Sequence, residues 1–172
     1  METANKVFDF SELERIGQGS SRNVYKWGDK VIKVARNAKG LEQNAMAGDY
    51  LLIGNGILPA MHGEGLDYII ADYVPRNDKV MRKKLKPIQH INRINCYDTS
   101  SQKALESVGL TILLNYDVLW SDILAYRNWG VTEGGDSVLV DEGAINANIY
   151  WGSTAELWAL EKWQKVRDIR KK

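Results

Sequence analysis

Three short runs near the N-terminus constrain the fold most, because each is rich in β-branched or aromatic residues and glycine-containing turns separate them. The runs are residues 13–16, 23–27 and 31–35, and the turns between them are residues 17–21 and 28–29. Short connections of this kind join antiparallel neighbours, because a parallel pair needs a long crossover. The sequence therefore predicts a three-stranded antiparallel meander.

The pattern then changes from strands to a helix. Residues 39–53 have apolar side chains at helical spacing and end at Gly54-Asn55-Gly56, which predicts one helix. Residues 68–74 form a strand-like run closed by Pro75, and residues 76–100 are basic and are expected to be irregular. Pro75 is the expected boundary between an N-terminal part, residues 1–75, and a C-terminal part, residues 76–172.

The second half predicts helices around one hairpin. Residues 101–119 are helical in pattern, and residues 128–131 and 138–140 are expected to pair across a turn that contains Gly134-Gly135. Residues 153–156, Ser-Thr-Ala-Glu, have the spacing of a capping box that opens a final helix. The apolar face expected for that helix consists of Leu157, Leu160, Trp163, Val166 and Ile169. The predicted fold class is α+β, with a small antiparallel sheet first and a mostly helical part after it.

Composition narrows the class of protein without naming a partner. The formal net charge of +1 gives no whole-molecule field, and Cys96, the single cysteine, cannot form an internal disulfide. The N-terminal residues lack the apolar core of a signal peptide, and no apolar run approaches the roughly 18 residues of a membrane span. We expect a cytoplasmic protein without a membrane partner.

Two features of the N-terminal part suggest phosphate binding. Gly17 and Gly19 lie in a turn between two predicted strands, where glycines let backbone amides approach a phosphate closely. Lys33 alternates with Ile32 and Val34 in a predicted strand and could direct its ammonium group toward phosphates. The alternatives are an ordinary turn and a lysine on the solvent face.

A second candidate site lies at the ends of the predicted hairpin. Asn128 precedes the outgoing strand and Asp141 follows the returning strand, so antiparallel pairing brings the two side by side. Carboxylate and amide oxygens suit Mg²⁺, which prefers oxygen ligands and keeps several waters. Asp122 lies just upstream and could serve as a base toward a hydroxyl. The alternative is that these residues only form turns.

These features occur in the order of the protein-kinase motifs: glycine loop, strand lysine, helix, linker strand, catalytic-loop aspartate, asparagine and Asp-x-Gly. Residues 24–35, 40–44, 128–131 and 138–143 resemble short kinase-like proteins of bacteriophages and bacteria. The resemblance implies a kinase-like fold, ATP and Mg²⁺ as cofactors, and phosphorylation of serine or threonine in a protein substrate.

The resemblance also implies roles for individual residues. Lys33 would bind the phosphates, Asp122 would be the base, and Asn128 and Asp141 would hold Mg²⁺. The remaining nucleotide-binding positions would be Gly17 and Gly19 in the loop, Val24 after it, Glu42 as the partner of Lys33, and the backbone of Asp72, Tyr73 and Val74 around adenine. Asp49 is the alternative partner of Lys33, since it would share a helix face with Glu42.

Departures from the kinase pattern motivate a second hypothesis about function. Arg22 replaces the third glycine of the loop, Asn128 follows Asp122 by six residues rather than five, and Glu142 replaces an apolar residue. A pseudokinase that binds a host or cellular protein partner without turnover is therefore the alternative function.

A third hypothesis, nucleic-acid binding, rests on the basic segments. Residues 76–93 contain seven arginine or lysine side chains and one acid, Asp78, and the final helix is also basic. Such clusters attract nucleic acid, and a solvated surface is the plainer explanation.

Overall fold

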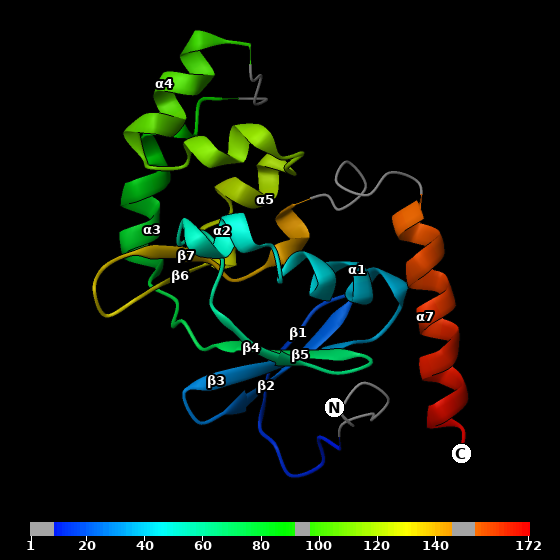
Figure 1. The fold of residues 1–172 in the computed structure, drawn as a ribbon. Helices are drawn as coiled ribbons and strands as arrows, with labels where there is room; N and C mark the ends of the chain where they lie inside the picture. Colours follow the sequence, from blue (N-terminus) through cyan, green and yellow to red (C-terminus); the bar gives the residue numbers. More distant parts are fainter. Residues whose placement is uncertain (1–8, 92–96, 146–153) are drawn as a thin grey trace. The chain divides into compact units, whose positions relative to one another are not determined.

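The computed structural model describes residues 9–91, 97–145 and 154–172 (Figure 1). The chain divides into two compact units. The first unit comprises Met1–Asp49, Ala60–Tyr73 and Trp151–Lys172, and the second comprises Tyr50–Pro59 and Val74–Tyr150. The transition after Tyr73 is close to the boundary expected at Pro75. The C-terminal segment, however, belongs with the first unit rather than with the rest of residues 76–172.

The first unit is built on a five-stranded antiparallel sheet of order β1-β2-β3-β5-β4. The strands are β1 (Arg15–Gln18), β2 (Arg22–Trp27), β3 (Lys30–Ala35), β4 (Met61–Glu64) and β5 (Tyr68–Asp72). The predicted meander is confirmed as β1 to β3, and so is the α+β class. Strand β4 was not predicted, because Met-His-Gly-Glu lacks strand-forming residues and becomes a strand only through its pairing with β5.

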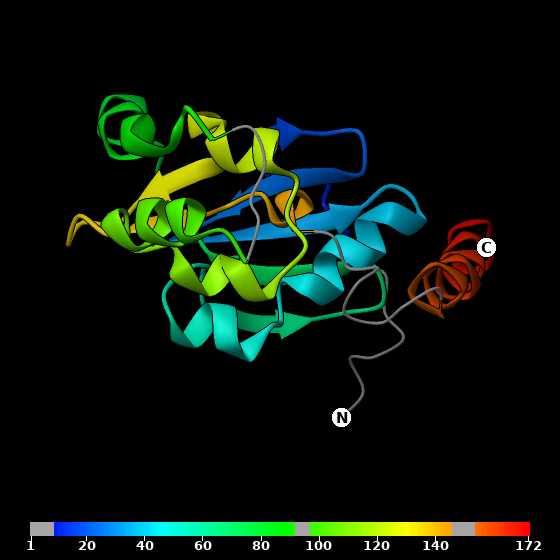
Figure 2. The same ribbon diagram turned by 90° about the horizontal axis from the view of Figure 1, so that it is seen from above.

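The two faces of β3 contribute to two hydrophobic clusters. Ile32 and Val34 pack with Tyr68 on one face, where Phe10 stacks on Tyr25. On the other face Ala35 packs with Leu41 of helix α1 (Ala38–Met46) and Ala159 of helix α7 (Thr154–Arg170). Helix α1 therefore packs on β3, and α7 packs on α1 (Figure 1 and Figure 2).

The single helix predicted over residues 39–53 is wrong. The structure has α1, ending at Met46, and a separate short helix α2 (Tyr50–Gly54), which belongs to the second unit. Gly48 lies in the break, where its amide donates to Ala45 O at 3.2 Å in a tightened turn. Glycine is a poor helix former, so the break falls where the helix is weakest. Asp49 lies beyond α1, and the helix face that it was expected to share with Glu42 does not exist.

The buried face predicted for the last helix is also wrong in part. Val166 is buried as expected, but Leu157 is 62% exposed and Leu160 is 51% exposed. The side chains that α7 buries besides Val166 are the small ones of Ala155 and Ala159. Small side chains let two helix backbones approach closely, and this decides which face α7 turns toward α1. Ser153, the first residue of the expected capping box, lies outside the described residues.

The second unit is mostly helical around one hairpin (Figure 1). Besides α2, its elements are α3 (Asp78–Leu85), η1 (Lys86–Ile88), α4 (Thr99–Ser107), η2 (Thr111–Asn115), α5 (Trp120–Leu124), η3 (Tyr126–Asn128), β6 (Trp129–Val131), β7 (Ser137–Leu139) and η4 (Glu142–Ala144), where η denotes a 3₁₀ helix. Its buried side chains include Met81, Leu85, Leu105, Leu113, Ile123 and Trp129.

Two predictions for this unit need correction. Residues 76–100 were expected to be irregular, but Asn77 caps α3 by accepting a hydrogen bond from Val80 N at 3.2 Å. The helix predicted over residues 101–119 is divided into α4 and η2, because Gly109 has a positive φ of 72°. Among the described residues, no helix combines the length and the apolarity needed to cross a bilayer.

Candidate functional site

The hairpin between β6 and β7 brings Asn128 and Asp141 together at its open end, as predicted. Trp129 pairs with Leu139, and beyond this pair the amides of Val140 and Asp141 donate to the Asn128 carbonyl at 2.8 and 3.3 Å. The backbone of Asp141 is therefore in contact with that of Asn128. Antiparallel pairing produced this arrangement from residues thirteen positions apart in the sequence.

The side chain of Asn128 joins the hairpin to the segment that contains Asp122. Asn128 is buried, and its Nδ2 donates to the Asp122 carbonyl at 3.0 Å. Next to it, the indole nitrogen of Trp129 donates to the Ile123 carbonyl at 2.8 Å. The two bonds tie the end of η3 and the first residue of β6 to α5. The main chain of Asp122 is thus held beside Asn128, while its carboxylate belongs to a half-buried residue.

Asp141 presents one carboxylate oxygen to the backbone of the segment that follows it. Its Oδ1 accepts from the Gly143 amide at 3.0 Å and so caps η4. With the Asn128 nitrogen oriented toward Asp122, the amide oxygen of Asn128 is the atom left for a cation. One amide oxygen and one carboxylate oxygen fit Mg²⁺, which takes few protein ligands and completes its octahedron with water and phosphate.

The ligand set at the hairpin is small. In the part of the chain that the structure describes, no group of three or more histidine, cysteine, aspartate or glutamate side chains could hold a metal ion. Glu142, which follows Asp141, is fully buried. Its carboxylate therefore belongs to the interior of the second unit. The candidate ligands for a cation at the hairpin are therefore the side chains of Asn128 and Asp141, as the sequence predicts.

Three residues predicted to contact nucleotide lie in one row across the sheet of the first unit. Gly17 is opposite Val24, and Val24 is opposite Lys33 in the neighbouring strand. Directly opposed residues point to the same face of a sheet. Lys33 is only 3% exposed, so it does not lie on the solvent face. Its strand neighbours Ile32 and Val34 occupy the opposite face, as the sequence alternation predicts.

Glu42, the partner expected for Lys33, forms an ion pair within its own helix. Glu42 is buried in α1, and its Oε2 accepts from Lys39 Nζ at 2.8 Å. Lys39 is one turn earlier on the same helix, a spacing at which opposite charges meet.

The glycine turn between β1 and β2 is held by its carbonyl groups. Gly19 O accepts from Arg36 Nη1 at 2.7 Å, and Ser20 O accepts from Asn37 Nδ2 at 3.1 Å. In a trans peptide the N–H points away from the carbonyl that precedes it. The amides of Ser20 and Ser21 therefore point away from Arg36 and Asn37, an orientation suited to anion binding.

The segment expected to receive adenine already uses part of its backbone. The Asp72 amide donates to Ala60 O at 3.0 Å, and the Tyr73 amide donates to Asp29 O at 3.0 Å. The Asp72 carboxylate pairs with His62 Nε2 at 2.5 Å. A purine at this segment would therefore have to bind its carbonyl groups or the amide of Val74.

Sequence reasoning missed a set of buried polar residues in the first unit. Arg22 is buried and contacts Asn44 Oδ1 at 3.5 Å, and Asn44 Nδ2 donates to the carbonyls of Lys33 and Asp67 at 3.4 and 3.3 Å. Asn44 thereby fixes α1 on β3. Arg22 was recognised only as a replaced glycine, and no local signal indicates that its side chain turns inward.

Comparisons with known proteins add no further constraint. No protein-family model matches the chain, and neither a curated protein nor a solved structure matches it.

Proposed function

We propose that this chain is an ATP-dependent phosphotransferase of protein-kinase-like fold that acts on serine or threonine hydroxyls. The observation that carries the proposal is the arrangement at the open end of the hairpin. There the Asn128 side chain is bonded to the Asp122 carbonyl, and the Asp141 amide is bonded to the Asn128 carbonyl. Hydrogen bonds within one unit thus join the residue that we propose as the base to the two residues that we propose as metal ligands.

The proposed roles follow from the chemistry of each group. Mg²⁺ and ATP, when bound, supply the transferable phosphoryl group and neutralise its charge. The amide oxygen of Asn128 and the carboxylate of Asp141 would hold the cation. The carboxylate of Asp122 accepts the proton of the attacking hydroxyl. Lys33 binds phosphate oxygens through its ammonium group.

The first unit supports a nucleotide-binding role by its strand order. Protein kinases place the phosphate-binding lysine on the third strand, after the glycine loop. Lys33 lies on β3, in the same row as Val24 and Gly17. Helix α1 follows this strand and packs on it, as the helix after the lysine strand does in kinases.

The direct test compares Asp141→Asn with the unchanged chain. Asparagine keeps an oxygen that can accept from the Gly143 amide, so the substitution removes charge and preserves the cap. We expect radiolabel transfer from ATP to the protein itself or to a lysate to be abolished. The matched control is Asp136→Asn, in the exposed turn of the same hairpin, which should leave transfer unchanged. Absence of transfer by the unchanged chain would reject the proposal.

Thermal stability measured with ATP and Mg²⁺ separates binding from turnover. A nucleotide present at a hundred times its Kd stabilises the folded state by about 2.7 kcal/mol. We expect Asp122→Asn to keep this stabilisation while slowing transfer by about 10²- to 10⁴-fold, because the base acts only in the chemical step. A variant that loses both would show that Asp122 is needed for binding rather than for proton transfer.

A binding module without turnover is the second candidate function. The observation that favours it is that the amides of Asp72 and Tyr73 already donate to protein carbonyls, so the adenine contact is reduced. It predicts one stoichiometric protein partner whose capture does not change in Lys33→Ala, together with no stabilisation by ATP. Loss of capture in that variant would instead indicate a nucleotide-dependent interaction.

A further inference from the structure

A stripe of lysines runs along α3 and η1 on the face directed to solvent. Lys79, Lys83 and Lys86 are spaced by four and three residues and are all exposed, and we call them the lysine stripe. Met81, Leu85 and Ile88 have the same spacing on the opposite face and are buried. Because the apolar face is fixed in the interior, the lysine stripe is held outward.

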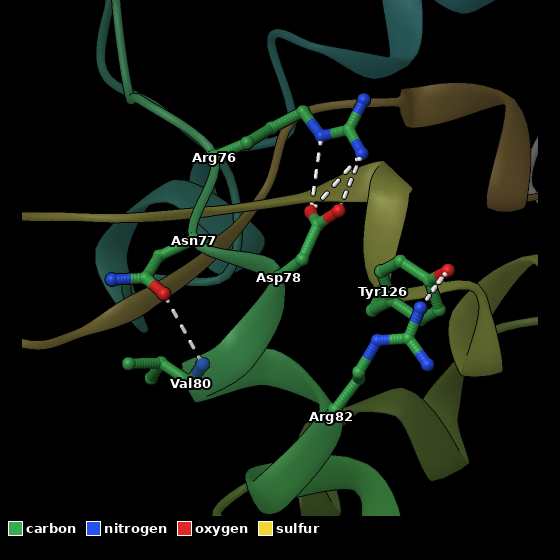
Figure 3. A network of polar contacts seen from close by, with 6 residues as sticks. All are labelled: Arg76, Asn77, Asp78, Val80, Arg82 and Tyr126. Carbon is green, nitrogen blue, oxygen red and sulfur yellow. Dashed lines mark hydrogen bonds and ion pairs between the residues drawn. The ribbon is translucent and has the colours of Figure 1, made fainter.

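The two arginines of this segment have partners nearby, as Figure 3 shows. Arg76 Nη2 contacts both carboxylate oxygens of Asp78 at 3.0 Å. The guanidinium group of Arg82 lies over the Tyr126 ring at 4.0 Å and donates to its hydroxyl. Burial lowers the pKa of Lys84, and the charge of Asp136 opposes that shift.

The positive charge of the lysine stripe is therefore available to bind another molecule. Asp78 is the single acid of residues 76–91, and Arg76 already neutralises it. Within the described ranges, no ion pair joins Lys79, Lys83 or Lys86 to a carboxylate. Three like charges on one face favour a ligand that carries repeated negative charge.

We propose that the lysine stripe binds the phosphate backbone of nucleic acid without sequence preference. The first and last lysines are seven residues apart, which is about 10 Å along the helix axis. One strand of a duplex presents a phosphate about every 3.4 Å of axis, so the lysine stripe spans about three phosphates. Lysine ammonium groups act on phosphates as point charges and read no base sequence.

Other polyanionic partners fit this surface less well. Protein interfaces take most of their energy from aromatic, arginine or apolar anchors at their centre, and the lysine stripe contains none. A helix that inserts into a membrane needs its apolar face free, but Met81, Leu85 and Ile88 are buried within the second unit. The proposal is independent of the phosphotransferase function, because it involves neither ATP nor the hairpin residues.

The number of lysines sets the expected salt dependence. Three phosphate contacts give a slope of about −2.7 for the logarithm of the binding constant against the logarithm of salt concentration. Affinity should therefore fall about 40-fold between 50 and 200 mM salt. Each single lysine-to-glutamine substitution should reduce the magnitude of the slope by about one.

The experiment measures fluorescence anisotropy of a labelled DNA duplex with the full chain, without ATP or magnesium. The test variant is Lys79→Gln/Lys83→Gln/Lys86→Gln. The matched control is Lys103→Gln/Lys165→Gln/Lys171→Gln, which changes the net charge equally at exposed lysines in α4, in α7 and just after α7. We expect the test variant to lose at least tenfold in affinity at 50 mM salt and the control to lose less than twofold. Circular dichroism checks that both variants fold.

Three results would overturn the proposal. One is an equal loss of affinity in both variants, which would show that only the net charge of the protein matters and not the position of the lysines. Another is absence of binding, or binding that salt does not weaken. The third is binding to vesicles containing phosphatidylserine with no binding to duplex or single-stranded DNA, which would assign the lysine stripe to a lipid surface.

Discussion

At the scale of single residues, the first unit depends on a buried carboxylate. Asp67 is 0% exposed, and its carbonyl accepts from the Ala35 amide at 2.7 Å. Its carboxylate accepts from Arg170, at the end of α7. Burial raises the pKa of Asp67, and the bond to Arg170 opposes that rise. The pair therefore links the sheet to the last turn of the chain's final helix.

We predict that Arg170→Ala lowers the free energy of unfolding by about 1–3 kcal/mol near neutral pH, because it leaves a buried acceptor without its donor. A carboxyl with a raised pKa takes up its proton at higher pH in the folded state than in the unfolded state. Protonation of Asp67 thus favours the folded state, and the loss should shrink as pH falls toward 4.

Urea denaturation at several pH values measures this effect. Arg167→Ala, an exposed position on the same helix, is the control and should change the free energy of unfolding by less than about 0.5 kcal/mol. Equal losses in the two variants, or a loss for Arg170→Ala that does not vary with pH, would contradict the role given to Asp67.

At the scale of elements, the approach of α1 to the β1–β2 turn requires a glycine. A Cβ atom on Gly40 would lie 2.2 Å from Ser21 O and 3.0 Å from Ala35 Cβ. The carbonyls of the same turn are held by Arg36 and Asn37, just before α1. The position of the glycine turn therefore depends on the close contact that Gly40 allows.

We predict that Gly40→Ala destabilises the protein by about 1–3 kcal/mol, because the helix or the turn must move to make room for the methyl group. Alanine is intrinsically the better helix former by about 1 kcal/mol, so the sign of the effect reports the packing. Gly54→Ala in α2, where a Cβ meets no atom within 4 Å, is the control and should be neutral or stabilising. Thermal or urea unfolding measures both variants. Equal stability of Gly40→Ala and Gly54→Ala would contradict the prediction.

At the scale of the whole molecule, the first unit is assembled from three separate segments of the chain. Helix α7 completes it, because Ala159 packs with Leu41 and Ala35. A change at this contact should therefore alter the local stability of strands that are more than a hundred residues away in sequence. The second unit has its own core around Trp129 and Leu139.

We predict that Ala159→Leu lowers hydrogen-exchange protection in α1 and β3 and leaves that of β6 and β7 unchanged. A larger side chain at a fully buried position forces α7 away from α1. Leu157→Gln, on the exposed face of the same helix, should leave protection in both units unchanged. Equal loss of protection in the two units would show that they do not open separately.

The sequence alone determined the features that local signals encode. Alternating strands and glycine turns predicted β1 to β3, and strand ends around Gly134-Gly135 predicted the hairpin that joins Asn128 to Asp141. Alternation also put Lys33 on the face opposite Ile32 and Val34. Each of these follows from neighbours a few residues apart, since pairing across a short turn leaves few alternatives.

Only the tertiary structure decided which apolar face α7 buries and where buried charges find partners. The helical spacing of apolar residues predicts that Leu157 and Leu160 are buried, but both are exposed. Close packing of α7 on α1 buries Ala155 and Ala159 instead. The contact of Arg170 with Asp67 joins residues 103 positions apart, and no local pattern encodes it. Such contacts depend on how elements fit together in space, because shape and burial determine their energy.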